Sequence, residues 1–226
     1  MSEGHIFQVL LQFGILLFSL CLHEFGHAAM ADRLGDPTPR LLGRLTLNPM
    51  AHADLLGTII LPLFQLFNPG LRIFGWAKPV PVTPENLKNP RWDSAKVAFA
   101  GPLANICLCF CALAAFAVLD LTGFFGVSES FRDSLTDFFN IFFWINFTLA
   151  ILNLIPIFPL DGSWILKAFL PPSVAYSYSR LERYGAVLLL LAFFLGWLKY
   201  YFMPATWALF SLLDIAGLHH LAGYLS

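Results

Sequence analysis

Five stretches of this 226-residue chain are long and apolar enough to cross a lipid bilayer as helices. The hydrocarbon core of a bilayer is about 30 Å thick, and a helix needs about 20 apolar residues to span it. Because hydrophobic residues make up 58 % of the chain and charged residues only 12 %, the sequence predicts an all-α polytopic membrane protein. The five stretches are residues 6–31, 97–119, 138–160, 185–203 and 204–225.

A sixth apolar stretch, residues 55–67, is shorter and is interrupted by Gly57 and Pro62. A stretch of this length can turn back within the membrane instead of crossing it. Short loops on the cytoplasmic side are enriched in Lys and Arg. If residues 55–67 turn back, all basic residues except Arg132 and Lys199 lie on one side. The sequence therefore predicts five to six spans, with five favoured, in the plasma or inner membrane and with the N-terminus outside.

The distribution of charge excludes other classes of partner. The formal net charge is −1, and the chain has no run of five or six like charges. A nucleic-acid partner is therefore not expected. No stretch is left over for a separate soluble domain, so we expect residues 1–226 to form one membrane-embedded domain.

The strongest local signal is the run HEFGH at residues 23–27. Side chains four residues apart share one face of a helix, so His23 and His27 can hold one Zn²⁺. Glu24 can then accept a proton from metal-bound water. Residues 6–22 contain no acidic, basic or histidine side chain, and ionisable groups at membrane depth are costly unless paired or ligated. The pattern indicates a zinc site; the alternative is a helix end whose polar side chains have no function.

A catalytic zinc has three protein ligands and one open position. The run NLIPIFPLDG at residues 153–162 supplies a candidate for the third ligand. Pro156 and Pro159 must interrupt the apolar helix there, and irregular backbone at membrane depth is tolerated only where it is buried in protein or lines a wet cavity. Asp161 is therefore well placed to reach the metal; the alternative is a turn at the membrane surface.

These motifs make the chain similar to a known family. It resembles the site-2 protease family of intramembrane zinc metalloproteases, in its small bacterial and archaeal form without a PDZ or CBS domain. The resemblance rests on HEFGH at 23–27, AGPLAN at 100–105 and NLIPIFPLDG at 153–162, which occur in the order typical of the family.

The resemblance implies a three-helix catalytic core with its active site toward the cytoplasmic side. It implies one Zn²⁺ per chain, bound by His23, His27 and Asp161. Glu24 is then the general base. Asn153 is implied to lie near the site as a second catalytic residue, where it stabilises the oxyanion or positions substrate.

A segment rich in Pro and Gly between residues 67 and 92 contains an apolar alternation at Val80 and Val82. Pro79 and Pro81 cannot donate hydrogen bonds, so any strand here must lie at the edge of a sheet. Edge strands have unpaired backbone groups that can capture an extended peptide. The sequence predicts a short edge strand or hairpin in which Val80 and Val82 hold substrate; the alternative is a surface loop that joins two helices.

Three other polar residues have structural interpretations. We interpret Asn105, in the AGPLAN motif, as a residue that packs helices together, with contact to the site as the alternative. His52 and Asp54 are interpreted as parts of a structural loop; an approach to the metal or gating of access is the alternative.

The predicted function is intramembrane proteolysis of a transmembrane protein substrate within the lipid bilayer. One alternative is a metal-ion transporter, which needs no Glu beside its ligands and usually repeats the ligands along a path. The other is a proteolytically inactive protein that binds membrane clients. Such a protein would be expected to lack one of the four catalytic residues, and all four are present.

Overall fold

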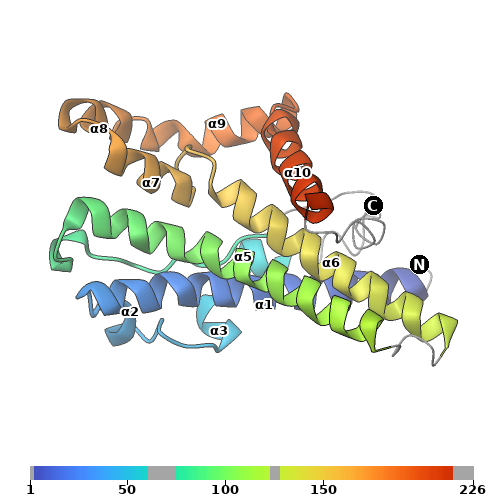
Figure 1. Cartoon of the computed structure of the whole chain (residues 1–226). Helices are drawn as coiled ribbons and strands as arrows, with labels where there is room; N and C mark the ends of the chain where they lie inside the picture. Colours follow the sequence, from blue (N-terminus) through green and yellow to red (C-terminus); the bar gives the residue numbers. More distant parts are fainter. Residues whose placement is uncertain (1–2, 61–74, 123–127, 216–226) are drawn as a thin grey trace.

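The computed structural model describes residues 3–60, 75–122 and 128–215 (Figure 1). These residues form helices and connecting segments and contain no β-strand, so the predicted all-α class is confirmed. The described elements are α1 (Glu3–Leu34), α2 (Thr38–Leu41), α3 (Pro49–His52), η1 (Leu55–Ile60), η2 (Pro84–Asn86), α5 (Pro90–Leu121), α6 (Glu129–Asn153), α7 (Asp161–Phe169), α8 (Pro172–Ser179), α9 (Glu182–Phe194) and α10 (Leu198–Ile215).

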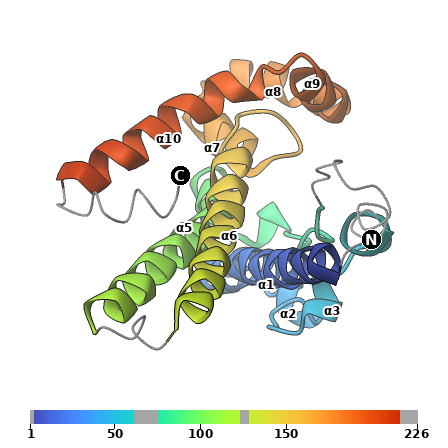
Figure 2. The ribbon, with the colours of Figure 1, turned by 90° about the vertical axis from the view of Figure 1, so that its right-hand side faces the viewer.

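The long helices α1, α5 and α6 form the centre of the molecule (Figures 1 and 2). They lie against one another, and each reverses the direction of the helix before it. Among the described residues, these three helices are long and apolar enough to cross a membrane, and the bent pair α9 and α10 adds a fourth if it counts as one span. The multi-pass character is thus confirmed, but the predicted number of five to six spans is not.

The last two helices meet at a different residue than predicted. The predicted boundary lies between Met203 and Pro204, whereas α9 ends at Phe194 and α10 begins at Leu198. The two helix axes differ by 74°. Gly196 lies in the break with a φ of 68°, a left-handed conformation that commonly ends helices and that glycine adopts without strain. The glycine therefore ends the helix, and the proline lies inside α10.

Small residues allow α1 and α5 to approach each other closely. A Cβ atom placed on Gly26 would lie 2.8 Å from the carbonyl oxygen of Ala100. Ala28 on α1 and Ala98 on α5 are buried nearby. Close packing through small side chains is typical of helix pairs in membranes. The two backbones are therefore in contact one residue before His27.

The helix break predicted around Pro156 and Pro159 is confirmed. Helix α6 ends at Asn153, residues 154–160 form turns, and α7 begins at Asp161. The break allows the chain to reverse and brings the first residue of α7 back toward α1. The position of Asp161 thus follows from where the apolar helix stops.

Arg91 fixes the other end of α7 to the start of α5. Its Nε donates to the carbonyl oxygen of Ala168 at 2.7 Å, and its Nη2 donates to that of Leu170 at 2.8 Å. The last carbonyls of a helix have no partner within the helix, and a cation near them is favourable. This interaction holds α7, and with it Asp161, in a fixed place on α5.

Only the beginning of the sixth apolar stretch is described, as η1. Thr58 in this helix donates through its hydroxyl to the carbonyl oxygen of Trp76 at 2.8 Å. The chain therefore returns next to the place where it left. Residues 61–74 between these points lie outside the described residues. The prediction that residues 55–67 turn back within the membrane therefore falls largely outside them as well.

Asp36, just beyond α1, joins this helix to the segment that precedes α5. Its Oδ1 accepts hydrogen bonds from the amide and hydroxyl of Thr38 and from the side chain of Asn86, and its Oδ2 accepts from the amide of Thr83 at 2.7 Å. The residue is fully buried. Burial alone raises the pKa of the Asp36 carboxyl, but the hydrogen bonds outweigh it and hold the pKa below its ordinary value of 3.8.

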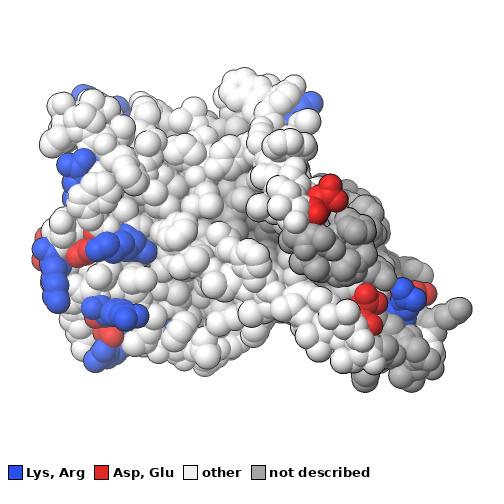
Figure 3. All heavy atoms as spheres, in the orientation of Figure 1, with Lys and Arg blue, Asp and Glu red and all other residues white. Residues whose placement is uncertain are grey.

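Charged side chains gather at the two ends of the molecule. Figure 3 shows most Lys and Arg of one face at the end where α1 finishes and α5 begins, and few at the opposite end. Exposed basic residues of the first end include Arg40, Lys78, Lys88 and Arg91. This separation agrees with the asymmetry of Lys and Arg on which the predicted topology rests.

We expect Asp36→Asn to lower the free energy of unfolding by about 2 kcal/mol, because an NH₂ group then faces a hydrogen-bond donor. The pKa of Asp36 is lower in the folded protein than its ordinary value of 3.8, so the ionised carboxylate stabilises the fold in full at pH values above 3.8. This stabilisation is lost as the pH falls through the lower pKa of the folded state. The difference in unfolding temperature between variant and wild type in detergent should therefore shrink below about pH 4.

Asp32→Asn is the matched control, because it removes an ion pair with Arg40, whose side chain is 64 % exposed. Exposed pairs of this kind contribute less than about 1 kcal/mol. An equal loss of stability in the two variants would contradict the role assigned to Asp36.

Candidate metal centre

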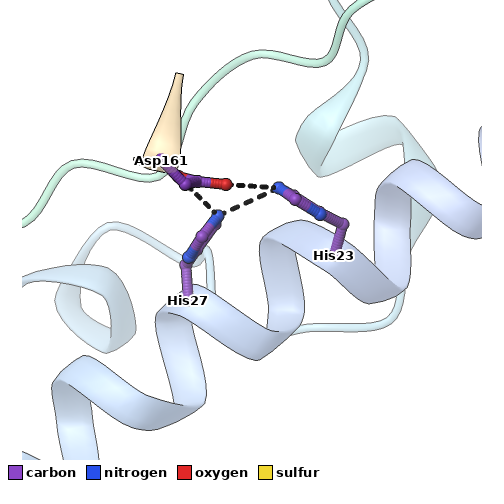
Figure 4. Close-up of side chains that lie close together, drawn as sticks. All are labelled: His23, His27 and Asp161. Carbon is purple, nitrogen blue, oxygen red and sulfur yellow. Dashed lines mark hydrogen bonds and ion pairs between the residues drawn. The ribbon is translucent and has the colours of Figure 1, made fainter. Parts of the chain in front are cut away.

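Two histidines and one aspartate converge between α1 and α7 (Figure 4). The Nε2 atoms of His23 and His27 lie 3.0 Å apart. Asp161 places Oδ2 3.2 Å from the first and Oδ1 3.4 Å from the second. Both histidines are buried and Asp161 is half-buried. Within the described part of the chain, these three make the one group of His, Cys, Asp or Glu side chains close enough to hold a metal ion.

Helix α5 orients both imidazole rings through their other nitrogen. His23 Nδ1 lies 2.6 Å from Oδ1 of Asn105, and His27 Nδ1 lies 2.7 Å from the carbonyl oxygen of Val97. A carbonyl oxygen only accepts, so the ring proton of His27 is on Nδ1. The same holds for His23 when the amide oxygen of Asn105 faces it. Both Nε2 atoms then carry a free lone pair.

The three groups that meet here are therefore all acceptors. Two Nε2 lone pairs cannot form a hydrogen bond with each other, despite their separation of 3.0 Å. Oδ2 of Asp161 is buried and has no hydrogen-bond partner of good geometry among the described residues. Buried acceptors that face one another are unfavourable unless a cation or a proton lies between them. The arrangement thus suits a cation.

The donor set and its spacing fit zinc. Ligands about 2.0–2.1 Å from a tetrahedral zinc ion lie roughly 3.4 Å from one another, which matches the separations of 3.0, 3.2 and 3.4 Å. A carboxylate binds a metal ion in its ionised form, as Asp161 would here. Two imidazoles and one carboxylate leave a fourth position open, as in catalytic zinc sites.

Gly101 provides the room in which the rings lie. A Cβ atom at this position would be 2.5 Å from Cε1 of His27 and 2.7 Å from Cε1 of His23. Any other residue would displace the rings. Val97, Gly101 and Asn105 are four residues apart and so form one stripe along α5. This stripe faces the histidines and explains why a glycine stands in the AGPLAN motif.

From the sequence, Asn105 was interpreted as a residue that packs helices together. That interpretation missed its contact with the site. It lies fully buried against His23. The four-residue spacing from Val97 through Gly101 to Asn105 is the signal that could have placed it at the site. Recognising the signal requires knowing which face of α5 meets α1.

Glu24 lies beside the ligands on α1 and is 8 % exposed. Its Oε2 accepts a hydrogen bond from the backbone amide of Val80 at 2.9 Å. The contact places the segment around Val80 next to the metal centre, although the two residues are far apart in sequence.

The predicted edge strand or hairpin is not found in the described residues. Pro79 and Pro81 have no amide hydrogen, and the neighbouring amides are bonded inside the protein: Lys78 to the His52 carbonyl at 2.8 Å, and Val80 to Glu24. A β-ladder needs free backbone amides at alternate residues. In this segment most backbone amides already donate hydrogen bonds within the protein.

Asn153, the other predicted catalytic residue, donates through its side chain to the Leu149 carbonyl of its own helix at 2.9 Å. This bond does not connect it with the three ligands. His52 and Asp54 have the structural roles expected: the ring of His52 bonds to the Thr46 carbonyl, and the Asp54 carboxylate accepts from the first amides of η1.

Comparison with protein families agrees with this arrangement. The model of Peptidase family M50 matches residues 12–132 and 120–195, which together contain every residue of the candidate site. No solved structure matches the chain significantly.

Relatives among curated sequences carry matching names. The chain is 37 % identical over 180 residues to "Putative zinc metalloprotease YwhC" of Bacillus subtilis (strain 168), a match that covers 79 % of this chain and 77 % of the relative. It is 30 % identical over 204 residues to "Putative zinc metalloprotease Rip2" of Mycobacterium tuberculosis (strain H37Rv), which covers 90 % of this chain and 73 % of the relative. The resemblance found in the motifs is thereby confirmed: the chain belongs to peptidase family M50, the family of site-2 proteases.

Proposed function

We propose that this metalloprotease hydrolyses peptide bonds in or near transmembrane segments of other membrane proteins, as in regulated intramembrane proteolysis. The observation that carries the proposal is the group of three acceptors made by His23 and His27, on the membrane-length helix α1, and by Asp161, at the start of α7. The names of the relatives, zinc metalloproteases, support Zn²⁺ as the ion. In this proposal residues 1–226 act as one membrane-embedded domain and hold one Zn²⁺.

The protein groups divide the chemistry among themselves. His23, His27 and Asp161 hold the ion. When bound, zinc lowers the pKa of water to about 7 and polarises a peptide carbonyl. The Glu24 carboxylate accepts a proton from the attacking water and donates it to the amine nitrogen of the cleaved bond. Asn153 donates to the developing oxyanion or positions substrate, which requires its amide to leave the Leu149 carbonyl.

The active site faces the cytoplasmic side in this proposal. The two histidines lie in the half of α1 that ends at Leu34, toward the end of the molecule that carries the exposed basic residues Arg40 and Arg91. Loops rich in Lys and Arg stay on the cytoplasmic side of a membrane. A substrate helix must therefore unwind near that surface before it is cut.

Two observations argue against the alternative functions. A transporter needs several ligand groups along its path, whereas the described residues hold one such group. An inactive client-binding protein has no need for a carboxylate next to the metal ligands, and Glu24 is present and buried there.

We further propose that substrate is captured along residues 76–83 before it is cut. The support is the contact of Val80 with Glu24, which brings this segment to the site. Between Lys78 and Thr83, Val82 is the one amide that is not bonded to another described residue. Val82 is thus the donor available to an extended peptide, and Val80 becomes available when it releases Glu24.

Glu24→Gln should retain zinc but lose proteolysis by a factor of about 10² to 10⁴, because the general base is removed and the ligands remain. His23→Ala, His27→Ala and Asp161→Ala should lose zinc affinity as well. Metal analysis of the purified variants and cleavage of a single-pass substrate in liposomes provide the two measurements.

Glu182→Gln is the matched control, since it makes the same change at an exposed position at the start of α9. Full zinc occupancy together with normal cleavage in Asp161→Ala would remove Asp161 from the site.

A cysteine at position 88 should be protected from an impermeant thiol reagent in intact cells, because the proposed topology leaves Lys88 on the cytoplasmic side. The measurement uses a background in which the four native cysteines are replaced by alanine. Asp133→Cys, at the opposite acidic end, is the accessible control. Labelling at position 88 from outside would contradict the re-entrant topology.

Val82→Pro should bind zinc normally yet cleave at least about tenfold more slowly, because it removes the amide donor left for substrate. Val82→Ala shortens the side chain but keeps this amide, so it should cleave like wild type. Val80→Pro is less informative, since it also removes a hydrogen bond from Glu24. Normal cleavage by Val82→Pro, at normal expression, would leave capture at this segment unsupported.

A further inference from the structure

A series of buried side-chain hydrogen bonds runs from His23 to helix α6. Oδ1 of Asn105 accepts from Nδ1 of His23 at 2.6 Å, and Nδ2 of Asn105 donates to Oδ1 of Asn146 at 2.9 Å. Nδ2 of Asn146 then donates to the carbonyl oxygen of Phe142 at 2.9 Å. Asn105 and Asn146 are both fully buried, so solvent does not compete for these bonds.

Each bond in this series has only one allowed direction. The Phe142 carbonyl only accepts, so the NH₂ group of Asn146 faces it and the Asn146 oxygen faces Asn105. The NH₂ group of Asn105 meets two acceptors, this oxygen and the Ser19 carbonyl at 3.4 Å. The oxygen of Asn105 is therefore left for His23.

The orientation of the Asn105 amide decides what His23 can bind. With the amide oxygen toward the ring, the proton lies on Nδ1 and the Nε2 lone pair is free for a metal. With the amide reversed, its NH₂ group would require an acceptor at Nδ1. The proton would then lie on Nε2, where it blocks the metal.

We propose that Asn146 is a positioning residue of the metal site: by fixing the Asn105 amide, it holds His23 in the tautomer that binds a metal through Nε2. The inference rests on the proposed metal site and extends it to a residue on α6 whose hydrogen bonds reach Asn105 and Phe142 but none of the three proposed ligands. A residue that only packs α5 against α6 would stabilise the fold, but it would have no effect on the tautomer of His23.

Asn146→Leu removes the acceptor for Asn105 and should raise the Kd of the full-length protein for Zn²⁺ about 10- to 100-fold, the range typical of residues that orient metal ligands. The Kd is measured in detergent by competition with a chromophoric chelator. Thr148→Val is the matched control, because it removes a polar atom from the same helix and leaves this series of bonds in place. If the leucine variant does not fold, Asn146→Ala also removes the acceptor.

Asn105→Asp separates orientation from packing. Both oxygens of a carboxylate accept, so a carboxylate at position 105 has no wrong orientation toward His23. In that background Asn146→Leu should cause no further loss of zinc affinity. An equal loss in both backgrounds, or wild-type affinity of the single variant Asn146→Leu, would overturn the proposal.

A second readout needs no metal. In the metal-free protein with ¹⁵N-labelled histidine, Nδ1 of His23, identified by the signals lost in His23→Gln, should carry a proton in wild type and should lack it in part of the Asn146→Leu molecules. The same tautomer in both would overturn the inference. A wild type that binds no zinc would contradict the proposed function instead, and the tautomer comparison would still decide the role of Asn146.

Discussion

The metal centre depends on the contact between one face of α5 and the two histidines of α1. Val97 and Asn105 each hold an Nδ1 atom, and Gly101 between them leaves room for both rings. Only the Nε2 atoms remain free, and they point at one place. Because the three α5 residues are spaced four apart, a single helix is enough to orient both imidazole rings.

The same helix also positions the third proposed ligand. Asp161 is the first residue of α7, and α7 is bound at its other end by Arg91 at the start of α5. One end of α5 therefore holds the carboxylate in place while its middle orients the imidazoles. Displacement of this helix would disturb all three ligands together, which makes α5 the element that organises the site.

The sequence predicted those structural features that depend only on residues close together in the chain. The four-residue spacing of His23 and His27, and the prolines before Asp161, each constrain the backbone within a few residues. They predicted the helix break and that these three side chains meet. The boundary between the last two helices was predicted wrongly because Pro204 is the stronger helix-breaking signal in the sequence. The break in the structure instead requires the positive φ of Gly196. When two nearby residues can each end a helix, their residue types alone do not show at which of them the helix ends in the folded protein.

The remaining features depend on contacts between distant residues. The amide of Val80 bonds to Glu24, so a segment that is typical of an edge strand uses its donors inside the protein. Asn105 bonds to His23 because that face of α5 is turned toward α1. Neither contact follows from composition or periodicity, since both depend on the relative placement of helices.

The central claim is that His23, His27 and Asp161 bind the metal through nitrogen and oxygen atoms. X-ray absorption at the zinc edge of the purified full-length protein measures the ligand atoms directly. We expect two imidazole nitrogens and carboxylate or water oxygen at about 2.0–2.2 Å, and no sulfur. A sulfur shell at about 2.3 Å, from any of the four free cysteines, or a spectrum unchanged in His23→Ala, would contradict this claim.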